Sequence, residues 1–210
     1  MKQKHGEKEK RVDWIATARN FMLGDFRAGK AVLKPQNILY TQDQSGFRFQ
    51  IIDFGLAIGR ESLFEIREYN VYTLPYRPPE ILIKNPYTTK ADVWALGCTL
   101  YEAYTGNSLF NMQSEADLLC SIYGKVGMVS PSSKLYHISM AIFQKLLLDV
   151  DSIKKLPSYD KNKPLISHPV INDLVMQMLH PDSTIRSNIY NLQNHDLFKS
   201  FRDGKIINET

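Results

Sequence analysis

The residues best suited to chemistry lie in three short motifs between Leu33 and Glu80. An amide at Asn37 and a carboxylate at Asp53 could supply the hard oxygen ligands that magnesium prefers, and Lys34 could supply a cation. A transferred phosphoryl group spreads negative charge over its oxygens, so its site needs both kinds of group. These residue types are therefore compatible with phosphoryl-transfer chemistry. An ordinary turn at Asp53 and a loop cap at Asn37 are the plainer alternatives.

The order and spacing of the motifs resemble the catalytic domain of Ser/Thr protein kinases. Residues 33–39 are similar to the catalytic loop, residues 51–55 to the metal-binding loop, and residues 73–80 to the end of the activation segment. One short match alone would be weak, but three in the right order are a strong signal. The third motif is most similar to the cyclin-dependent and mitogen-activated (CMGC) group. There Arg77 would match an arginine characteristic of proline-directed kinases.

The resemblance implies a role for each site residue. Asn37 and Asp53 match the family's metal ligands and would hold Mg²⁺ and, with it, ATP. Lys34 would balance charge near the transferred phosphate, and Thr73 belongs to the same catalytic set. Pro75 replaces the tryptophan of the group's pattern, which leaves the substrate preference open.

The position of the catalytic base departs from the family pattern. The base lies five residues before the metal-binding asparagine, and here that residue is Val32, preceded by Ala31. Valine cannot accept a proton, and Asp25 is too far along the chain to replace the base without rebuilding the loop. A general base contributes about 10²–10⁴ in rate, so a severely weakened kinase is predicted. Ala31 also stands where the family has an arginine that usually pairs with a phosphorylated activation loop.

Composition fits one large domain or two small ones. The chain has 210 residues, 43% of them hydrophobic, and a formal net charge of +4. This modest charge gives no reason to predict nucleic-acid binding, and no stretch approaches the roughly 18 apolar residues of a membrane-spanning helix. Cys98 and Cys120 lack metal-ligand spacing and suggest free thiols in a reducing compartment. An intracellular location, cytoplasmic or nuclear, is expected.

The resemblance divides the chain into three parts. Residues 1–32 form a charged N-terminus with a helical pattern at 12–26, residues 33–201 correspond to the kinase C-lobe, and residues 202–210 form a tail. Five short strands and a helix would exceed the residues available before Leu33, and no glycine-rich phosphate loop occurs there. We therefore expect the small N-terminal lobe to be absent and ATP and Mg²⁺ to bind weakly.

The expected fold is α+β but mainly α: a kinase-like C-terminal lobe with one short β-hairpin. Apolar alternation over residues 47–52 predicts a half-buried strand, which pairs with residues 38–40 across a turn at 41–46. Residues 91–104 are apolar almost all round and predict a buried central helix. Further helices are expected after the cap residue Ser114, at 138–148 and at 170–179.

Three more residues match structural positions of the family. Asp92, in the central helix, would anchor the backbone of the catalytic loop. Arg186 ends a turn that resembles the family's His/Asp-Pro-x-x-x-Arg pattern, and it would pair with Glu80 at the end of the activation segment. An ordinary surface position is the plainer alternative for this arginine.

These observations favour a pseudokinase or truncated kinase that acts by binding proteins. An active ATP-dependent Ser/Thr kinase whose N-terminal part lies outside this sequence is the alternative, and a nonfunctional remnant is a third. In a complete kinase the strands around Leu39 lie beneath the small lobe. Their apolar surface is therefore expected to bind a protein partner, for example the small lobe of another kinase, with no role for nucleic acid or membrane.

Overall fold

The computed structural model describes residues 33–43, 46–53, 72–147 and 159–198. The helix predicted at 12–26, the base position Val32 and most of the activation segment lie outside the described residues, as does the C-terminal tail.

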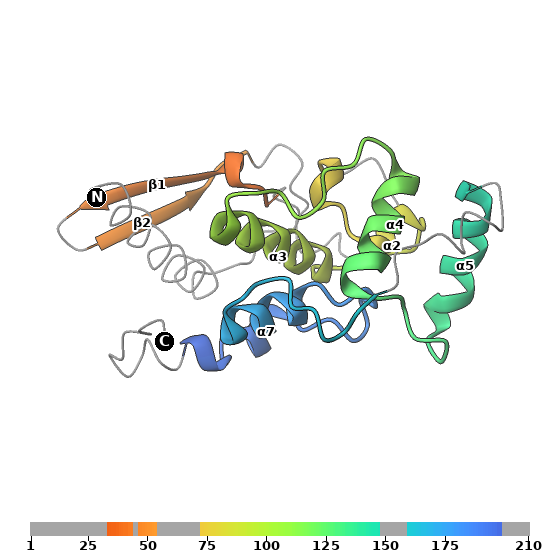
Figure 1. Cartoon of the computed structure of the whole chain (residues 1–210). Helices are drawn as coiled ribbons and strands as arrows, with labels where there is room; N and C mark the ends of the chain where they lie inside the picture. The colour runs from red at the N-terminus through yellow and green to blue at the C-terminus, as the bar shows by residue number, and fades with distance from the viewer. Residues whose placement is uncertain (1–32, 44–45, 54–71, 148–158, 199–210) are drawn as a thin grey trace.

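The described residues form mostly helices and one two-stranded sheet (Figure 1). In chain order the elements are the 3₁₀ helix η1 (Pro35–Asn37), strands β1 (Ile38–Asp43) and β2 (Gly46–Ile51), the 3₁₀ helix η3 (Leu74–Tyr76), and helices α2 (Pro79–Leu82), α3 (Lys90–Thr105), α4 (Glu115–Val126), α5 (Lys134–Leu147), α7 (Pro169–Met178) and α8 (Ile189–Leu192). The mainly helical class with one antiparallel hairpin is as predicted. The absence of a small lobe stays a prediction.

The hairpin projects from the helical body (Figure 1). Its antiparallel register places Ile38 opposite Ile51 and Asp43 opposite Gly46, so the strands continue into the turn predicted at 41–46. Backbone pairing does not require apolar side chains, and the polar residues of this stretch therefore hid the extension from a pattern-based reading.

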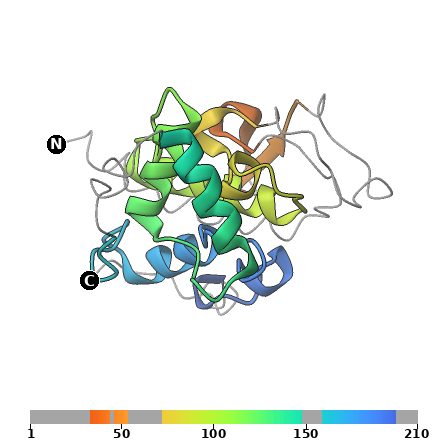
Figure 2. The same ribbon diagram turned by 90° about the vertical axis from the view of Figure 1, so that its right-hand side faces the viewer.

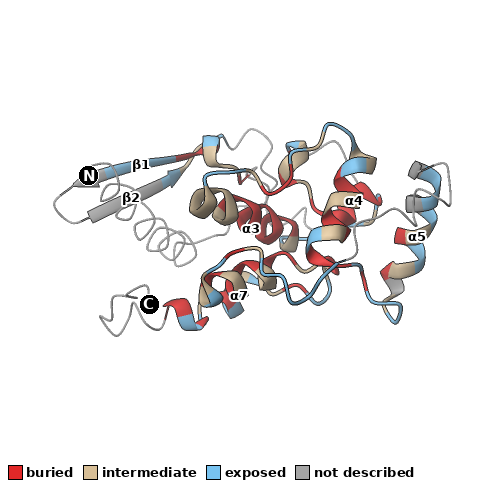
Figure 3. Ribbon diagram, viewed as in Figure 1, coloured by how far each residue is buried: buried red, intermediate tan, exposed pale blue. Residues whose placement is uncertain are grey.

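Helix α3 forms the centre of the core and packs against α7, η3 and η1 (Figure 3). Its residues 91–99 are all buried, whereas residues 100–105 are half-buried. The prediction of a helix buried on every side is therefore wrong for its last turns. The reason lies in the side chains of this part, which include the carboxylate of Glu102 and the hydroxyls of Tyr101 and Tyr104, and such groups are costly to bury without partners.

A glycine ends α3, and the predicted cap residue Ser114 begins α4. Gly106 ends α3 in the left-handed region, with φ 76°, and its N–H donates to the Glu102 carbonyl at 2.8 Å. Ser114 caps α4, because its hydroxyl oxygen accepts from the Asp117 N–H at 3.1 Å. The same hydroxyl donates to the Asp117 carboxylate at 2.6 Å, which replaces the return bond to the backbone found in a full capping box.

Helix α5 packs against α4 and lies nearest the viewer in Figure 2. It begins at Lys134, four residues before the predicted helix at 138–148. The Ser133 hydroxyl accepts from the Leu135 N–H at 3.2 Å, so a serine supports this earlier start. Helix α7 begins at Pro169 and matches the stripe predicted at 170–179 to within one residue. Among the described residues, no helix has the length and apolar character that crossing a bilayer requires.

Helices α3 and α7 approach each other closely at Gly97. A Cβ atom added there would lie 2.9 Å from the Met178 Cβ and 3.0 Å from the Leu179 Cδ2. These distances are shorter than ordinary carbon contacts, so any side chain at this position must push the helices apart.

Gly97→Ala should therefore lower the free energy of unfolding by about 1–3 kcal/mol through overpacking. A Gly→Ala change inside a helix otherwise stabilises by up to about 1 kcal/mol, so the sign of the effect is diagnostic. Urea denaturation of the parent and the variant measures it, with Gly124→Ala in α4 as the control for helix propensity. A Gly97→Ala protein more stable than the parent would contradict the close approach.

Candidate active site

The base of the hairpin brings two predicted site residues to one place. The Asn37 carbonyl accepts from the Ile52 N–H at 2.9 Å, and Asp53 follows Ile52 directly. The preceding segment is fixed on α3, because the Thr99 hydroxyl lies 3.0 Å from the Leu33 carbonyl. Leu33 itself is buried in the core. The fold thus holds the segment of residues 33–37 and the start of the metal-loop motif together.

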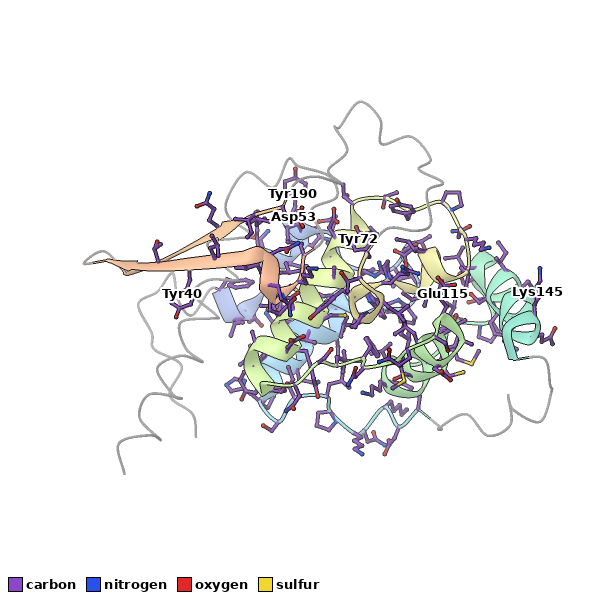
Figure 4. All side chains as sticks on the ribbon, turned by 90° about the horizontal axis from the view of Figure 1, so that it is seen from above. Tyr40, Asp53, Tyr72, Glu115, Lys145 and Tyr190 are labelled. Atoms are coloured by element: carbon purple, nitrogen blue, oxygen red, sulfur yellow. The ribbon has the colours of Figure 1, made fainter. Side chains whose placement is uncertain are left out.

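Asn37 and Asp53 differ in their surroundings. Asn37 is buried, whereas Asp53 is exposed and has left-handed backbone with φ 67° (Figure 4). Aspartate tolerates this region better than most residues. An amide and a carboxylate oxygen fit the donor preference of Mg²⁺. Within the described part of the chain, no group of three or more His, Cys, Asp or Glu residues offers an alternative metal site.

Lys34 and Thr73 also come together, although 39 positions separate them in sequence. The Lys34 Nζ donates to the Thr73 Oγ1 at 3.4 Å, a long hydrogen bond between exposed groups. This contact links the catalytic-loop motif to the end of the activation segment. Val32, where the family resemblance places the catalytic base, lies outside the described residues.

Tyr72 joins the activation segment to α3 from within the core. Its hydroxyl donates to the Asp92 Oδ1 at 2.5 Å, and both side chains are buried. Burial and the neighbouring Asp92 carboxylate raise the pKa of Tyr72 well above its usual value. No sequence pattern marked this contact. The role predicted for Asp92 in anchoring the catalytic-loop backbone stays a prediction.

Arg77 and Tyr76 fix the next turn of the segment. The Arg77 Nη2 donates to the Tyr72 carbonyl at 3.1 Å, and its Nη1 forms an ion pair with Glu115 at the start of α4. The Tyr76 hydroxyl donates to the Glu102 Oε2 of α3 at 2.7 Å. Side chains of α3 and α4 therefore hold this part of the segment from two sides.

Glu80 and Arg186 form a buried, bidentate ion pair. The Arg186 Nη1 and Nη2 donate to the two Glu80 carboxylate oxygens at 2.7 and 2.8 Å, and each residue is 1% exposed. Two further donors are used as well, since Nε donates to the His180 carbonyl at 2.9 Å and Nη1 to the Lys90 carbonyl at 2.8 Å. The guanidinium also lies 5.0 Å from the centre of the Trp94 ring. The alternative of a surface position for Arg186 is therefore wrong.

The turn that ends in Arg186 is itself held by Asp182. Its carboxylate accepts from the Ser133 hydroxyl at 2.5 Å, the Thr184 N–H at 2.8 Å and the Thr184 hydroxyl at 2.7 Å. Burial alone would raise the pKa of Asp182, but these hydrogen bonds lower it. The link to Ser133, at the start of α5, was not predicted, because a hydrogen bond between distant residues leaves no periodic signal in sequence.

A mainly helical body with one antiparallel hairpin, an Asn37/Asp53 pair at the base of that hairpin and a buried Glu80–Arg186 pair is consistent with the protein kinase fold. The family model described as the protein kinase domain matches residues 32–198, and the chain belongs to this family.

Similar proteins place the chain among kinases of the Ser/Thr CMGC type. It is 42% identical over 110 residues to cyclin-dependent kinase 4 of Xenopus laevis, which is 52% of this chain and 33% of the relative. It is 33% identical over 168 residues to human cyclin-dependent kinase-like 2, covering 80% of this chain and 33% of the relative. It is 30% identical over 179 residues to a probable dual specificity protein kinase YAK1 homolog of Encephalitozoon cuniculi (strain GB-M1), covering 80% of this chain and 43% of the relative. The chain thus spans less than half the length of these curated relatives.

Removal of Arg186 tests the buried pair. Arg186→Ala would leave the Glu80 carboxylate buried without its cation, which should cost about 3–5 kcal/mol of unfolding free energy. Denaturant titration followed by circular dichroism measures the change. Lys161→Ala, at an exposed position, is the matched control and should stay within about 0.5 kcal/mol of the parent. Equal stability of Arg186→Ala and the parent would contradict the geometry described above.

Proposed function

We propose that this chain is a kinase domain that no longer transfers phosphate efficiently and acts by binding proteins. The single observation that carries the proposal is Val32, at the position where the family has its catalytic base. A hydrocarbon side chain cannot accept the proton of a substrate hydroxyl, whatever the geometry of the surrounding residues. The structural framework of the lobe supports a retained binding role, because the Glu80–Arg186 pair is kept although the base is lost.

An active Ser/Thr kinase is the second candidate, and a specific set of residues favours it. Asn37 and Asp53 offer oxygen ligands for Mg²⁺, which when bound would neutralise charge on the phosphates of ATP. Lys34 keeps its contact with Thr73. In this case Asn37 and Asp53 position the nucleotide, Lys34 compensates charge near the transferred phosphate, and the substrate hydroxyl loses its proton without help from residue 32.

Phosphate transfer separates the two candidates. Purified protein with Mg²⁺ and radiolabelled ATP should show no transfer above that of Asp53→Ala, either to itself or to generic protein substrates. If residual transfer exists, Val32→Asp should increase it by about 10²–10⁴, the usual contribution of a general base. Efficient transfer by the parent, abolished by Asp53→Ala and not improved by Val32→Asp, would contradict the proposal.

The surface that we propose for protein binding lies on the hairpin. Leu39 is 51% exposed and Tyr40 is 62% exposed, both on β1, and Figure 4 shows Tyr40 on the hairpin, away from the helical body. Contiguous exposed apolar patches are typical of protein-binding sites, and we propose that Leu39 belongs to such a patch. The relatives named as cyclin-dependent kinases support a protein partner in general. The partner that we propose is the small lobe of another kinase.

Leu39→Asp tests this surface. A charge in place of a partly buried leucine at an interface should abolish capture of a purified kinase small lobe by the immobilised chain, while circular dichroism and the melting temperature stay unchanged. Tyr190→Asp, which alters an apolar residue on α8 that is 70% exposed, is the matched control and should leave capture intact. If the parent is a monomer that captures no small lobe, and Leu39→Asp behaves identically, the proposed partner is wrong.

A further inference from the structure

The end of the activation segment depends on an unusual backbone conformation at Tyr72. This residue has φ 70°, in the left-handed region that bulky side chains rarely adopt. Conformations of this kind persist only where the surrounding contacts fix them. At Tyr72 two contacts fix the conformation, one through the side chain and one through the backbone carbonyl.

The first contact acts through the side chain. The Tyr72 hydroxyl donates to the Asp92 carboxylate at 2.5 Å, and the ring is 6% exposed. Figure 4 shows Tyr72 beside the helical body, in contrast to Tyr40 on the hairpin. Because Asp92 lies in the stretch of α3 whose residues are all buried, its carboxylate provides a rigid acceptor. A hydrogen bond to a charged group is stronger than a bond between neutral groups.

The second contact acts through the backbone. The left-handed peptide of Tyr72 presents its carbonyl to the Arg77 Nη2, 3.1 Å away, and the same guanidinium pairs with Glu115 of α4. A continuous series of polar contacts therefore runs from α3 through Tyr72 and Arg77 to α4. It encloses the short helix η3, whose last residue is Tyr76.

Phosphorylation is the usual way to order an activation segment, through an arginine of the catalytic loop. In this chain the corresponding residue is Ala31, which cannot bind phosphate. The guanidinium of Arg77 is already occupied by Glu115 and the Tyr72 carbonyl. Among the described residues, Tyr72 and Arg77 make polar contacts with Asp92, Glu115 and the Tyr72 carbonyl, none of which requires a phosphate group.

We propose that Tyr72 is a positioning residue that fixes the end of the activation segment without phosphorylation. Its hydroxyl bond to Asp92 holds the left-handed peptide, and the carbonyl of that peptide holds Arg77 against α4. The inference concerns the conformation of residues 72–77 and does not depend on whether the chain transfers phosphate, so it can fail while the proposed function stands.

Amide hydrogen exchange, followed by NMR on the full chain after phosphatase treatment, tests the proposal. The reporters are the N–H groups of Tyr76 and Arg77, which donate within η3 at 2.9 and 3.1 Å, and the reference is the N–H of Leu179 in the core, which donates at 2.9 Å. In the phosphate-free parent we expect both reporters to be protected. Tyr72→Phe should accelerate their exchange roughly 10- to 100-fold, the value of a hydrogen bond to a charged group, and leave the exchange of Leu179 unchanged.

Tyr190→Phe, which removes a hydroxyl from an exposed ring, is the matched control and should alter none of the three amides. Equal acceleration of all three by Tyr72→Phe would assign Tyr72 to general stability and overturn the proposal, as would no acceleration. If Tyr72→Phe does not fold, the exchange rates of the Tyr76 and Arg77 N–H groups in the phosphate-free parent test the proposal instead. Protected reporters there support the inference, and exchange at the rate of an unfolded chain overturns it.

Discussion

The buried ion pair between Glu80 and Arg186 is the constraint on which the rest of this lobe depends. Two charges taken out of water are stable only when each finds its partner and its remaining hydrogen-bonding groups are satisfied. Here one guanidinium meets that demand by contacting α2, the carbonyl at the start of α3, and the turn before α8. Arg186 lies 106 positions along the chain from Glu80 and 96 from Lys90, so this one side chain joins segments that are distant in sequence.

The hydrogen bonds around this ion pair continue into the turn that carries Arg186. The turn that carries Arg186 is shaped by Asp182, whose carboxylate also accepts from Ser133 at the start of α5. Helix α5 is thereby connected, through hydrogen bonds rather than apolar packing, to the residue that holds the activation segment. Buried polar networks of this kind specify one arrangement more strictly than apolar contacts do, since a half-satisfied network is costly.

Local features of this structure could be predicted from sequence patterns, whereas contacts between distant residues could not. Helices α3, α4 and α7 and the hairpin follow from local periodicity and from caps such as Ser114, and the pairing of Glu80 with Arg186 followed from family resemblance. The contacts of Tyr72 with Asp92 and of Ser133 with Asp182 did not follow from either. Both join single residues across 20 or more positions, and no repeat or composition shift accompanies such a bond.

The contacts that place the described site residues are independent of the side chain at position 32, where the family resemblance puts the catalytic base. Asn37 and Leu33 are placed by backbone hydrogen bonds and by the Thr99 hydroxyl, none of which involves the side chain of residue 32. The contacts that hold these two residues therefore do not depend on the chemistry of position 32. The arrangement of the described residues is compatible with an active kinase as well as with the impaired kinase that we propose.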